Sequence, residues 1–179
     1  IGKDYFTKLP PVIIKKIMEM LQGEDNFNLM KSSGLLDKII STMHLDLSGV
    51  CLTLPKLNRM IPDLMKFKTL SLRLAKLGNL SVIESKITHL IVRYSFDINY
   101  IKRCPLKSLE IRSLFLSYSS KELMGFPELE SLTIKSKRKN RIVDPEKYGF
   151  VLPAKLKYLY LENSGDVNVK IMGGLTNLE

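Results

Sequence analysis

Four cationic residues each follow directly after a short apolar segment of this chain: Arg73, Arg93, Arg112 and Lys135. If these segments lie side by side as parallel strands about 4.8 Å apart, the four cations form a ladder roughly 14 Å long. Like charges this close repel one another unless water or anions surround them. The planar guanidinium group of arginine can donate two parallel hydrogen bonds to a carboxylate or a phosphate. We therefore expect these residues, flanked by Tyr158 and Tyr160, to bind an acidic or phosphorylated segment of a substrate protein. A solvated basic face is the alternative.

The other residue types that commonly do chemistry do not form a recognisable site. The sequence contains no glycine-rich phosphate loop, no GxSxG turn, no HExxH motif and no pair of carboxylates at a useful spacing. His44 and His89 occupy the third position of two apolar segments, which should place them roughly 10 Å apart, too far to share a metal. Cys51 and Cys104 have no second pair of ligands nearby. We expect neither an enzyme nor a bound metal, cofactor or disulfide.

The apolar segments share a six-residue pattern with apolar residues at the first, fourth and sixth positions. They are TMHLDL at 42–47, a weaker copy, FKTLSL at 67–72, ITHLIV at 87–92, LKSLEI at 106–111, LESLTI at 129–134 and LKYLYL at 156–161, and a seventh can begin at Leu178. Their first positions lie 25, 20, 19, 23, 27 and 22 residues apart, in or near the span of about 20 to 29 residues found in leucine-rich repeats. The spacing predicts an α/β solenoid of irregular leucine-rich repeats that form a curved parallel sheet.

Each segment is expected to form one short strand. We predict parallel strands near residues 43–47, 68–73, 88–93, 107–112, 130–135 and 157–162. The fourth and sixth positions share one face of a strand, so stacked copies should bury Leu45, Leu70, Leu90, Leu109, Leu132 and Leu159 in one core. Asp46 and Glu110 lie on the opposite, concave face, where Glu110 can pair with Arg112 or Arg93.

The connections between segments are short and lack the Asn or Cys typical of regular leucine-rich repeats. That position holds Ala75, Ser95, Leu114, Lys137 and Ser164. We therefore expect an irregular array connected by short helices, single turns or extended pieces rather than full helices. The longest interval contains SKRKNR at 136–141, which should protrude either as a solvated loop or as a nuclear-localisation or nucleic-acid patch.

Residues 9–40 lack the repeat pattern and predict three short helices. The first should run from about residue 11, after Pro10, to residue 21, with Ile13, Ile14, Ile17 and Leu21 on an apolar face. Asp25 can cap a second short helix, and a glycine at position 34 precedes a third.

The succession of Leu9-Pro10, Ile13, Ile17, Leu21, Asp25 and Leu29 resembles the F-box, a helical module that docks on the adaptor subunit of cullin-RING ubiquitin ligases. The resemblance covers roughly residues 7–40 and implies that Leu9, Pro10, Ile13, Ile14, Ile17 and Leu21 face the adaptor. The second half of that family's module often has a valine-cysteine pair and a tryptophan, whereas this chain has Ser32, Ser33 and Gly34 in that region and no Trp anywhere. The alternative is that these helices only cap the N-terminal end of the solenoid.

The chain is thus divided into a helical F-box-like segment at 1–40 and a repeat solenoid at 41–179, which is expected to continue beyond the last residue. An F-box followed by leucine-rich repeats is the layout of one class of substrate receptors of cullin-RING (SCF-type) ligases, and such a receptor does no chemistry itself. The alternative is a repeat scaffold of another intracellular complex, for instance a nuclear one, that contacts nucleic acid through its basic charge.

The composition of the chain indicates which partners and which cellular location to expect. The 28 Lys and Arg exceed the 18 Asp and Glu, and the net charge of +10 favours acidic partners. The sequence has neither an apolar run of about 18 residues nor an apolar signal segment at its start. We expect a cytoplasmic or nuclear protein without a membrane partner.

Overall fold

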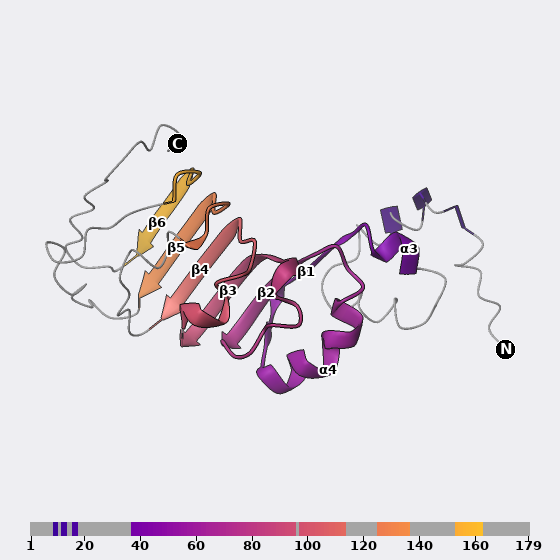
Figure 1. Cartoon of the computed structure of the whole chain (residues 1–179), viewed down its shortest axis with the longest axis horizontal. Helices are drawn as coiled ribbons and strands as arrows, with labels where there is room; N and C mark the ends of the chain where they lie inside the picture. Colours follow the sequence, from indigo (N-terminus) through magenta and orange to yellow (C-terminus); the bar gives the residue numbers. More distant parts are fainter. Residues whose placement is uncertain are drawn as a thin grey trace, which may run out of the picture.

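A six-stranded parallel sheet is the main element of the computed structural model, which describes residues 9–10, 12–13, 16–17, 37–95, 97–113, 125–136 and 153–162 (Figure 1). The strands are β1 (His44–Leu52), β2 (Thr69–Lys76), β3 (Ile87–Ser95), β4 (Ser108–Ser113), β5 (Ser131–Ser136) and β6 (Tyr158–Glu162). They lie in chain order, and each pairs in parallel with the next. Every predicted strand is therefore confirmed, although β1, β2 and β3 continue beyond their predicted ends.

Apolar side chains on one face of the sheet form a continuous core. The predicted core leucines of β1 to β5 are at most 1% exposed, and Leu159 of β6 is partly buried against them. The first position of the later segments is buried as well, at Phe67, Ile87, Leu106, Leu129 and Leu156. Each strand from β2 to β6 is therefore accompanied by apolar core side chains both along its length and at or just before its first residue.

A tight turn precedes four of the strands. The backbone N–H groups of Met43, Phe67, Leu129 and Leu156 donate to the carbonyl oxygen three residues earlier, over 2.9 to 3.2 Å. The turns begin at the buried residues Ile40, Leu64, Phe126 and Pro153. Because the first residue of each turn is buried in the core, the turn is anchored there. The position at which the following strand begins is thereby fixed.

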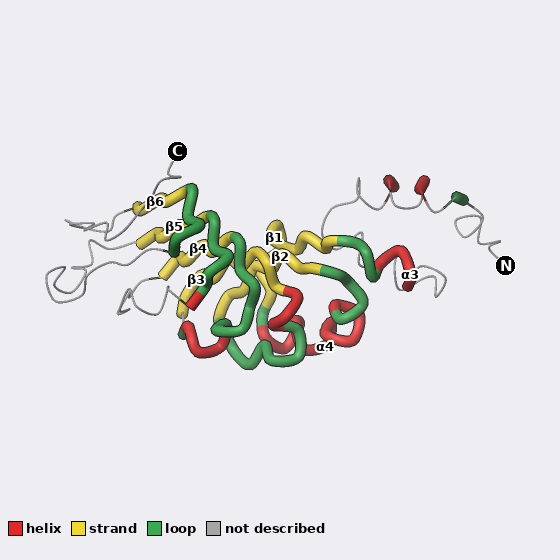
Figure 2. Tube along the Cα trace, turned by 45° about the horizontal axis from the view of Figure 1, so that its top comes forward, coloured by secondary structure: helices red, strands yellow, loops and turns green. Residues whose placement is uncertain are grey.

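One connection differs from the prediction. Between β1 and β2 the chain forms α4 (Leu54–Leu64), a helix of eleven residues, where we expected only a short helix, a turn or an extended piece. Its buried residues Leu57, Met60 and Leu64 recur at helical spacing, and a proline in its first turn suits a helix start. Figures 1 and 2 show α4 beside β1 and β2. The other described helices, α3 (Asp37–Ile40), η3 (Glu84–Lys86) and η4 (Ile98–Tyr100), are short, as expected.

The register between β2 and β3 also differs from the prediction, by two residues. Leu72 pairs with Leu90, whereas the repeat pattern placed Leu70 opposite Leu90. The pairing is irregular at Thr88, a buried residue that has no partner between the pairs Leu70–Ile87 and Ser71–His89. A shift of two residues keeps every apolar side chain on the same face of the strand, so the alternating pattern could not reveal it.

A second irregularity lies in β1. Leu47 pairs with Leu72, but the next residue of β2, Arg73, pairs with Cys51. The intervening residues of β1, from Ser48 to Val50, form a bulge. Ser48 follows Leu47 directly but, because of this bulge, does not lie opposite Arg73.

Little of the predicted N-terminal helical segment is described. Residues 12–13 and 16–17 are helical, and α3 ends just before β1. Ile14, Leu21, the basic residues 137–141 and the start of the seventh repeat at Leu178 lie outside the described residues. Within the described ranges no helix is long and apolar enough to cross a membrane.

Leu109→Ala should destabilise the chain by about 2 to 5 kcal/mol, because the substitution leaves a cavity beneath β4 where the leucine is fully buried. Ser108→Ala, one residue earlier and on the opposite face, should change stability by less than about 0.5 kcal/mol. Urea unfolding of the two variants measures the difference. Equal losses would show that the two faces of β4 are assigned wrongly.

Candidate interaction surface

The face of the sheet opposite the leucine core carries mainly polar side chains, and we call it the open face. Three rows follow from the strand register. The first contains Asp46, Ser71, His89, Ser108, Ser131 and Tyr158; the second contains Cys51, Arg73, Ile91, Glu110, Thr133 and Tyr160; the third contains Arg112, Lys135 and Glu162. Arg93 directly follows Val92, which pairs with Ile111, so Arg93 lies at the β3 end of the third row.

The predicted ladder of four cations in one register is wrong at its first member. Arg93, Arg112 and Lys135 share the third row, whereas Arg73 lies in the second row between Cys51 and Ile91. The two-residue offset between β2 and β3 causes this separation. Arg73 therefore belongs to a different part of the open face from the other three cations.

Acidic side chains already pair with the cations of β4 and β5. The Nε of Arg112 donates to Oε1 of Glu110, which confirms the pairing expected from the sequence. The Nζ of Lys135 lies 3.9 Å from Oε1 of Glu110 and 3.9 Å from Oε2 of Glu162. These contacts compensate much of the positive charge in the third row.

The two tyrosines expected beside the cations project from β6. Tyr158 and Tyr160 are each more than half exposed and lie in the first and second rows. The Nζ of Lys135 lies 5.4 Å from the centre of the Tyr160 ring, within reach of a cation–π interaction. The β6 end of the open face is thus an exposed aromatic surface.

Two histidines meet above β2, contrary to the separation of roughly 10 Å predicted from the repeats. The ring centres of His44 and His89 lie 5.7 Å apart in an edge-to-face arrangement. The two ring nitrogens of His44 form hydrogen bonds of 2.8 Å with Thr69 and Ser71. Ser71 lies opposite His89, so the offset of β3 brings the second imidazole towards the first.

The surroundings of both imidazoles disfavour the protonated form and lower the pKa of each. Burial lowers the pKa of His44 and of His89 from the ordinary value of 6.5, and the neighbouring His89 lowers the pKa of His44 further. The carboxylate of Asp46 opposes this effect at both rings. A neutral His44 can donate to one of its hydroxyl partners and accept from the other.

The polar groups of this cluster are not arranged as a catalytic site. Ser71 and His44 are residue types that can act as nucleophile and base, but Ser71 is only 6% exposed. The second nitrogen of His44 bonds to the hydroxyl of Thr69 instead of a carboxylate. The contact therefore satisfies a buried hydroxyl rather than presenting a nucleophile to a substrate.

No metal cluster is evident in the part of the chain that the structure describes, where no group of three or more His, Cys, Asp or Glu could hold an ion. Cys51 and Cys104 are free thiols. Burial, assisted by the charge of Glu84, raises the pKa of Cys104 to about 12. That thiol stays protonated at neutral pH and is a poor nucleophile.

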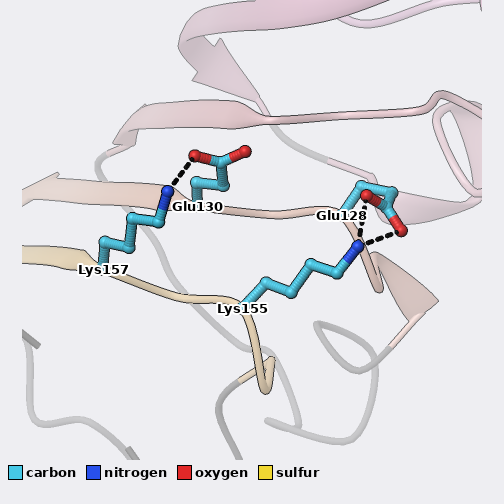
Figure 3. A network of polar contacts seen from close by, with 4 residues as sticks. All are labelled: Glu128, Glu130, Lys155 and Lys157. Carbon is cyan, nitrogen blue, oxygen red and sulfur yellow. Dashed lines mark hydrogen bonds and ion pairs between the residues drawn. The ribbon is translucent and has the colours of Figure 1, made fainter. Parts of the chain in front are cut away.

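Ion pairs join the beginnings of β5 and β6 at the edge of the sheet. Lys155 contacts both carboxylate oxygens of Glu128 at 2.7 and 2.8 Å, and Lys157 contacts Glu130 at 2.9 Å (Figure 3). The hydrogen bond from Lys157 holds the pKa of Glu130 below its ordinary value. Because all four side chains are well exposed, these pairs contribute little to the stability of the fold.

Four of the residues expected to face an adaptor are described. Leu9, Pro10 and Ile13 are exposed, with Ile13 at 44%, and Ile17 is half-buried. Val12 is 75% exposed beside them. The apolar side chains that the structure describes at this end are therefore not all buried against the first strand.

No family model, curated protein or solved structure matches this chain. Its function therefore has to be inferred from its own residues and their arrangement.

Replacing both histidines, as His44→Gln with His89→Gln, should reduce the loss of stability at acidic pH. Because folding lowers both pKa values, the unfolded chain binds more protons, so this stability is present above about pH 6.5 and is lost as the pH falls through the lower folded values. Urea unfolding at pH 8 and pH 5.5 measures the change. Identical pH dependence in the wild type and the double variant would contradict the assignment.

A double-mutant cycle on Glu110 and Arg112 should give a coupling of about 0.2 to 1 kcal/mol that weakens as salt is added. The matched control is the cycle on Glu110 and Arg73, which lie in one row but two strands apart. That coupling should be close to zero. Equal coupling in the two cycles would mean that Glu110 is not preferentially paired with Arg112.

Proposed function

We propose that this chain is a protein-interaction module, the substrate-recognition subunit of a cullin-RING ubiquitin ligase. Its strands stack as an irregular leucine-rich-repeat solenoid with the open face on the concave side. Its N-terminal helices bind the ligase adaptor, and the open face binds the substrate. The chain performs no catalysis, since ubiquitin transfer belongs to another subunit.

The chain-order stacking of the strands is the observation that carries this proposal. Each strand pairs only with its sequence neighbours, and the apolar residues of successive repeats join one core. A repeat array of this kind leaves one uninterrupted sheet face available for a partner. The parallel order and the repeat spacing support the solenoid over an unrelated α/β arrangement.

The exposed apolar residues at the N-terminal end support the adaptor site. A cap would bury its apolar side chains against the first repeat, yet Leu9, Val12 and Ile13 are exposed. An apolar surface of this kind is a feature of protein-docking sites. These residues fall where the sequence resembles an F-box.

The substrate site is proposed on the open face, where Arg73, Arg93, Arg112, Lys135, Tyr158 and Tyr160 lie on neighbouring strands. Arginine and tyrosine are common in protein-binding surfaces because both combine contact area with polar groups. An acidic or phosphorylated protein segment complements this composition.

A protein partner fits the open face better than nucleic acid does. The net charge of +10 attracts both, but Glu110 and Glu162 lie beside Arg112 and Lys135 and interrupt the continuous row of cations that the repeating phosphates of a nucleic acid require. The exposed tyrosines add surface that a protein segment can bury. We place such a receptor in the cytoplasm or the nucleus, where cullin-RING ligases act.

Ile13→Glu and Ile17→Glu should each abolish binding to a purified ligase adaptor, because a charge cannot be buried in an apolar interface without a partner. The matched control is Val82→Glu, which introduces the same charge at an exposed apolar residue of the repeat region. The control should bind as the wild type does. A pull-down on immobilised adaptor reports binding, and urea unfolding verifies that the repeats remain folded.

Adaptor binding by the wild type that survives both isoleucine substitutions would refute the proposed docking surface. Failure of the folded wild-type chain to bind any adaptor would refute the receptor function.

A further inference from the structure

We propose that the surface at the beginnings of β2, β3 and β4 binds single-stranded nucleic acid through its phosphate backbone and one stacked base. We call it the strand-entrance surface, and it consists of Lys68, Lys86, Tyr100, Arg103 and Lys107. This inference goes beyond the proposed function and depends neither on the adaptor nor on the open face. It assigns a partner to positive charge that lies outside the open face.

One lysine directly precedes each of these three neighbouring strands, namely Lys68 before β2, Lys86 before β3 and Lys107 before β4. The backbone N–H of Lys107 donates to the carbonyl oxygen of Thr88 at 2.7 Å. The Nζ of Lys86 donates to the carbonyl oxygen of Phe67 at 2.6 Å, which brings its ammonium group beside the start of β2. Neighbouring strands lie about 4.8 Å apart and their starts are offset, so adjacent lysines of the row lie roughly 6 to 8 Å apart at the backbone.

No acidic side chain compensates this row. Among the described residues, Lys68, Lys86 and Lys107 form no ion pair, and the first and last of them are exposed. Glu130 is next to Lys107 across the sheet, but its carboxylate contacts Lys157 at 2.9 Å (Figure 3). The uncompensated row therefore ends at β4, because the charges at the starts of β5 and β6 are paired.

The connection before β4 adds a guanidinium group and an aromatic ring. The Nη1 of Arg103 lies 3.8 Å from Oε1 of Glu84, two residues before Lys86, so this connection lies beside the start of β3. The Arg103 side chain is 85% exposed, and such a solvated pair is weak. Tyr100 is 44% exposed, and its backbone N–H donates to the carbonyl oxygen of Asp97. The exposed ring therefore lies on a hydrogen-bonded turn close to the cations.

A row of lysines suits the repeating phosphates of a nucleic acid better than it suits a protein. The ammonium group is a compact point charge that can contact any phosphate oxygen, whereas protein interfaces are depleted of lysine. An exposed tyrosine beside such a row offers a face on which a base can stack, a combination typical of proteins that bind single strands. The bases of a duplex are already stacked and paired. Binding should therefore favour single strands and depend little on sequence.

The first test measures fluorescence anisotropy of labelled oligouridine and oligothymidine of equal length, titrated with the full chain. Contacts to three or four phosphates predict a slope of log K against log salt of about −2 to −3, a loss of roughly twenty- to fiftyfold between 50 and 200 mM NaCl. Equal binding of both strands indicates recognition of the shared phosphate backbone, and tighter binding of oligouridine adds a contact to the 2′-hydroxyl.

Lys68→Gln with Lys107→Gln should lower the affinity at least about tenfold at 50 mM NaCl and make the salt slope shallower by about 1.4. The matched control is Lys76→Gln with Lys155→Gln. It removes the same charge from exposed lysines outside the surface, one of them at the far end of β2, and should bind within about twofold of the wild type. Equal losses in the two double variants would overturn the site, because net charge alone would then explain the binding.

Tyr100→Ala should lower the affinity at least about fivefold without changing the salt slope, because stacking neutralises no phosphate. Tyr100→Phe keeps the face of the ring and should bind as the wild type does. Equal binding by Tyr100→Ala and the wild type would overturn the assignment of a stacked base.

The absence of oligonucleotide binding would overturn the whole proposal. Tighter binding of a polyglutamate peptide would do so in favour of an acidic protein, and tighter binding of vesicles that contain phosphatidylserine in favour of a membrane surface. Lys68 and Lys107 are exposed, so the variants should unfold at the urea concentration of the wild type. Oligonucleotide binding without adaptor binding would support this surface and contradict the receptor function, whereas the converse result would overturn only this surface.

Discussion

Burial of leucine side chains between neighbouring strands is the interaction on which the rest of this structure depends. A single strand with its turn exposes most of its apolar surface, and only stacking against the preceding and following strands removes that surface from water. The core leucines of β1 to β5 are almost completely buried, whereas Leu159 on the last described strand is less so. The same constraint explains the chain-order pairing and the parallel direction of the sheet.

Because the core occupies one face, the strand register alone determines which polar side chains meet on the other. An offset of two residues between β2 and β3 leaves the core intact but moves every open-face residue relative to its neighbour. It separates Arg73 from Arg93 and brings His44 and His89 to a ring distance of 5.7 Å. The meeting of the two histidines is therefore a consequence of a local irregularity in the strand pairing.

The six strands, their core leucines and the Glu110–Arg112 pair could be predicted because period-two patterns and repeat spacing report them directly. Helix α4 differs from the prediction although Leu57, Met60 and Leu64 recur at helical spacing, because the repeat pattern describes the strands and not the connections between them. The histidine pair could not be predicted without the register, and a two-residue shift preserves the apolar pattern. A hint was present: both histidines occupy the third position of their segments, with Thr69 and Ser71 on the segment between them.

The arrangement of the open face follows from the register of β2 against β3. Interstrand nuclear Overhauser effects measure it directly in the isotopically labelled chain. The offset register predicts backbone contacts between Leu72 and Leu90 and between Ser71 and His89, together with contacts between the imidazole rings of His44 and His89. Backbone contacts between Leu70 and Leu90, with no contact between the two imidazoles, would contradict it.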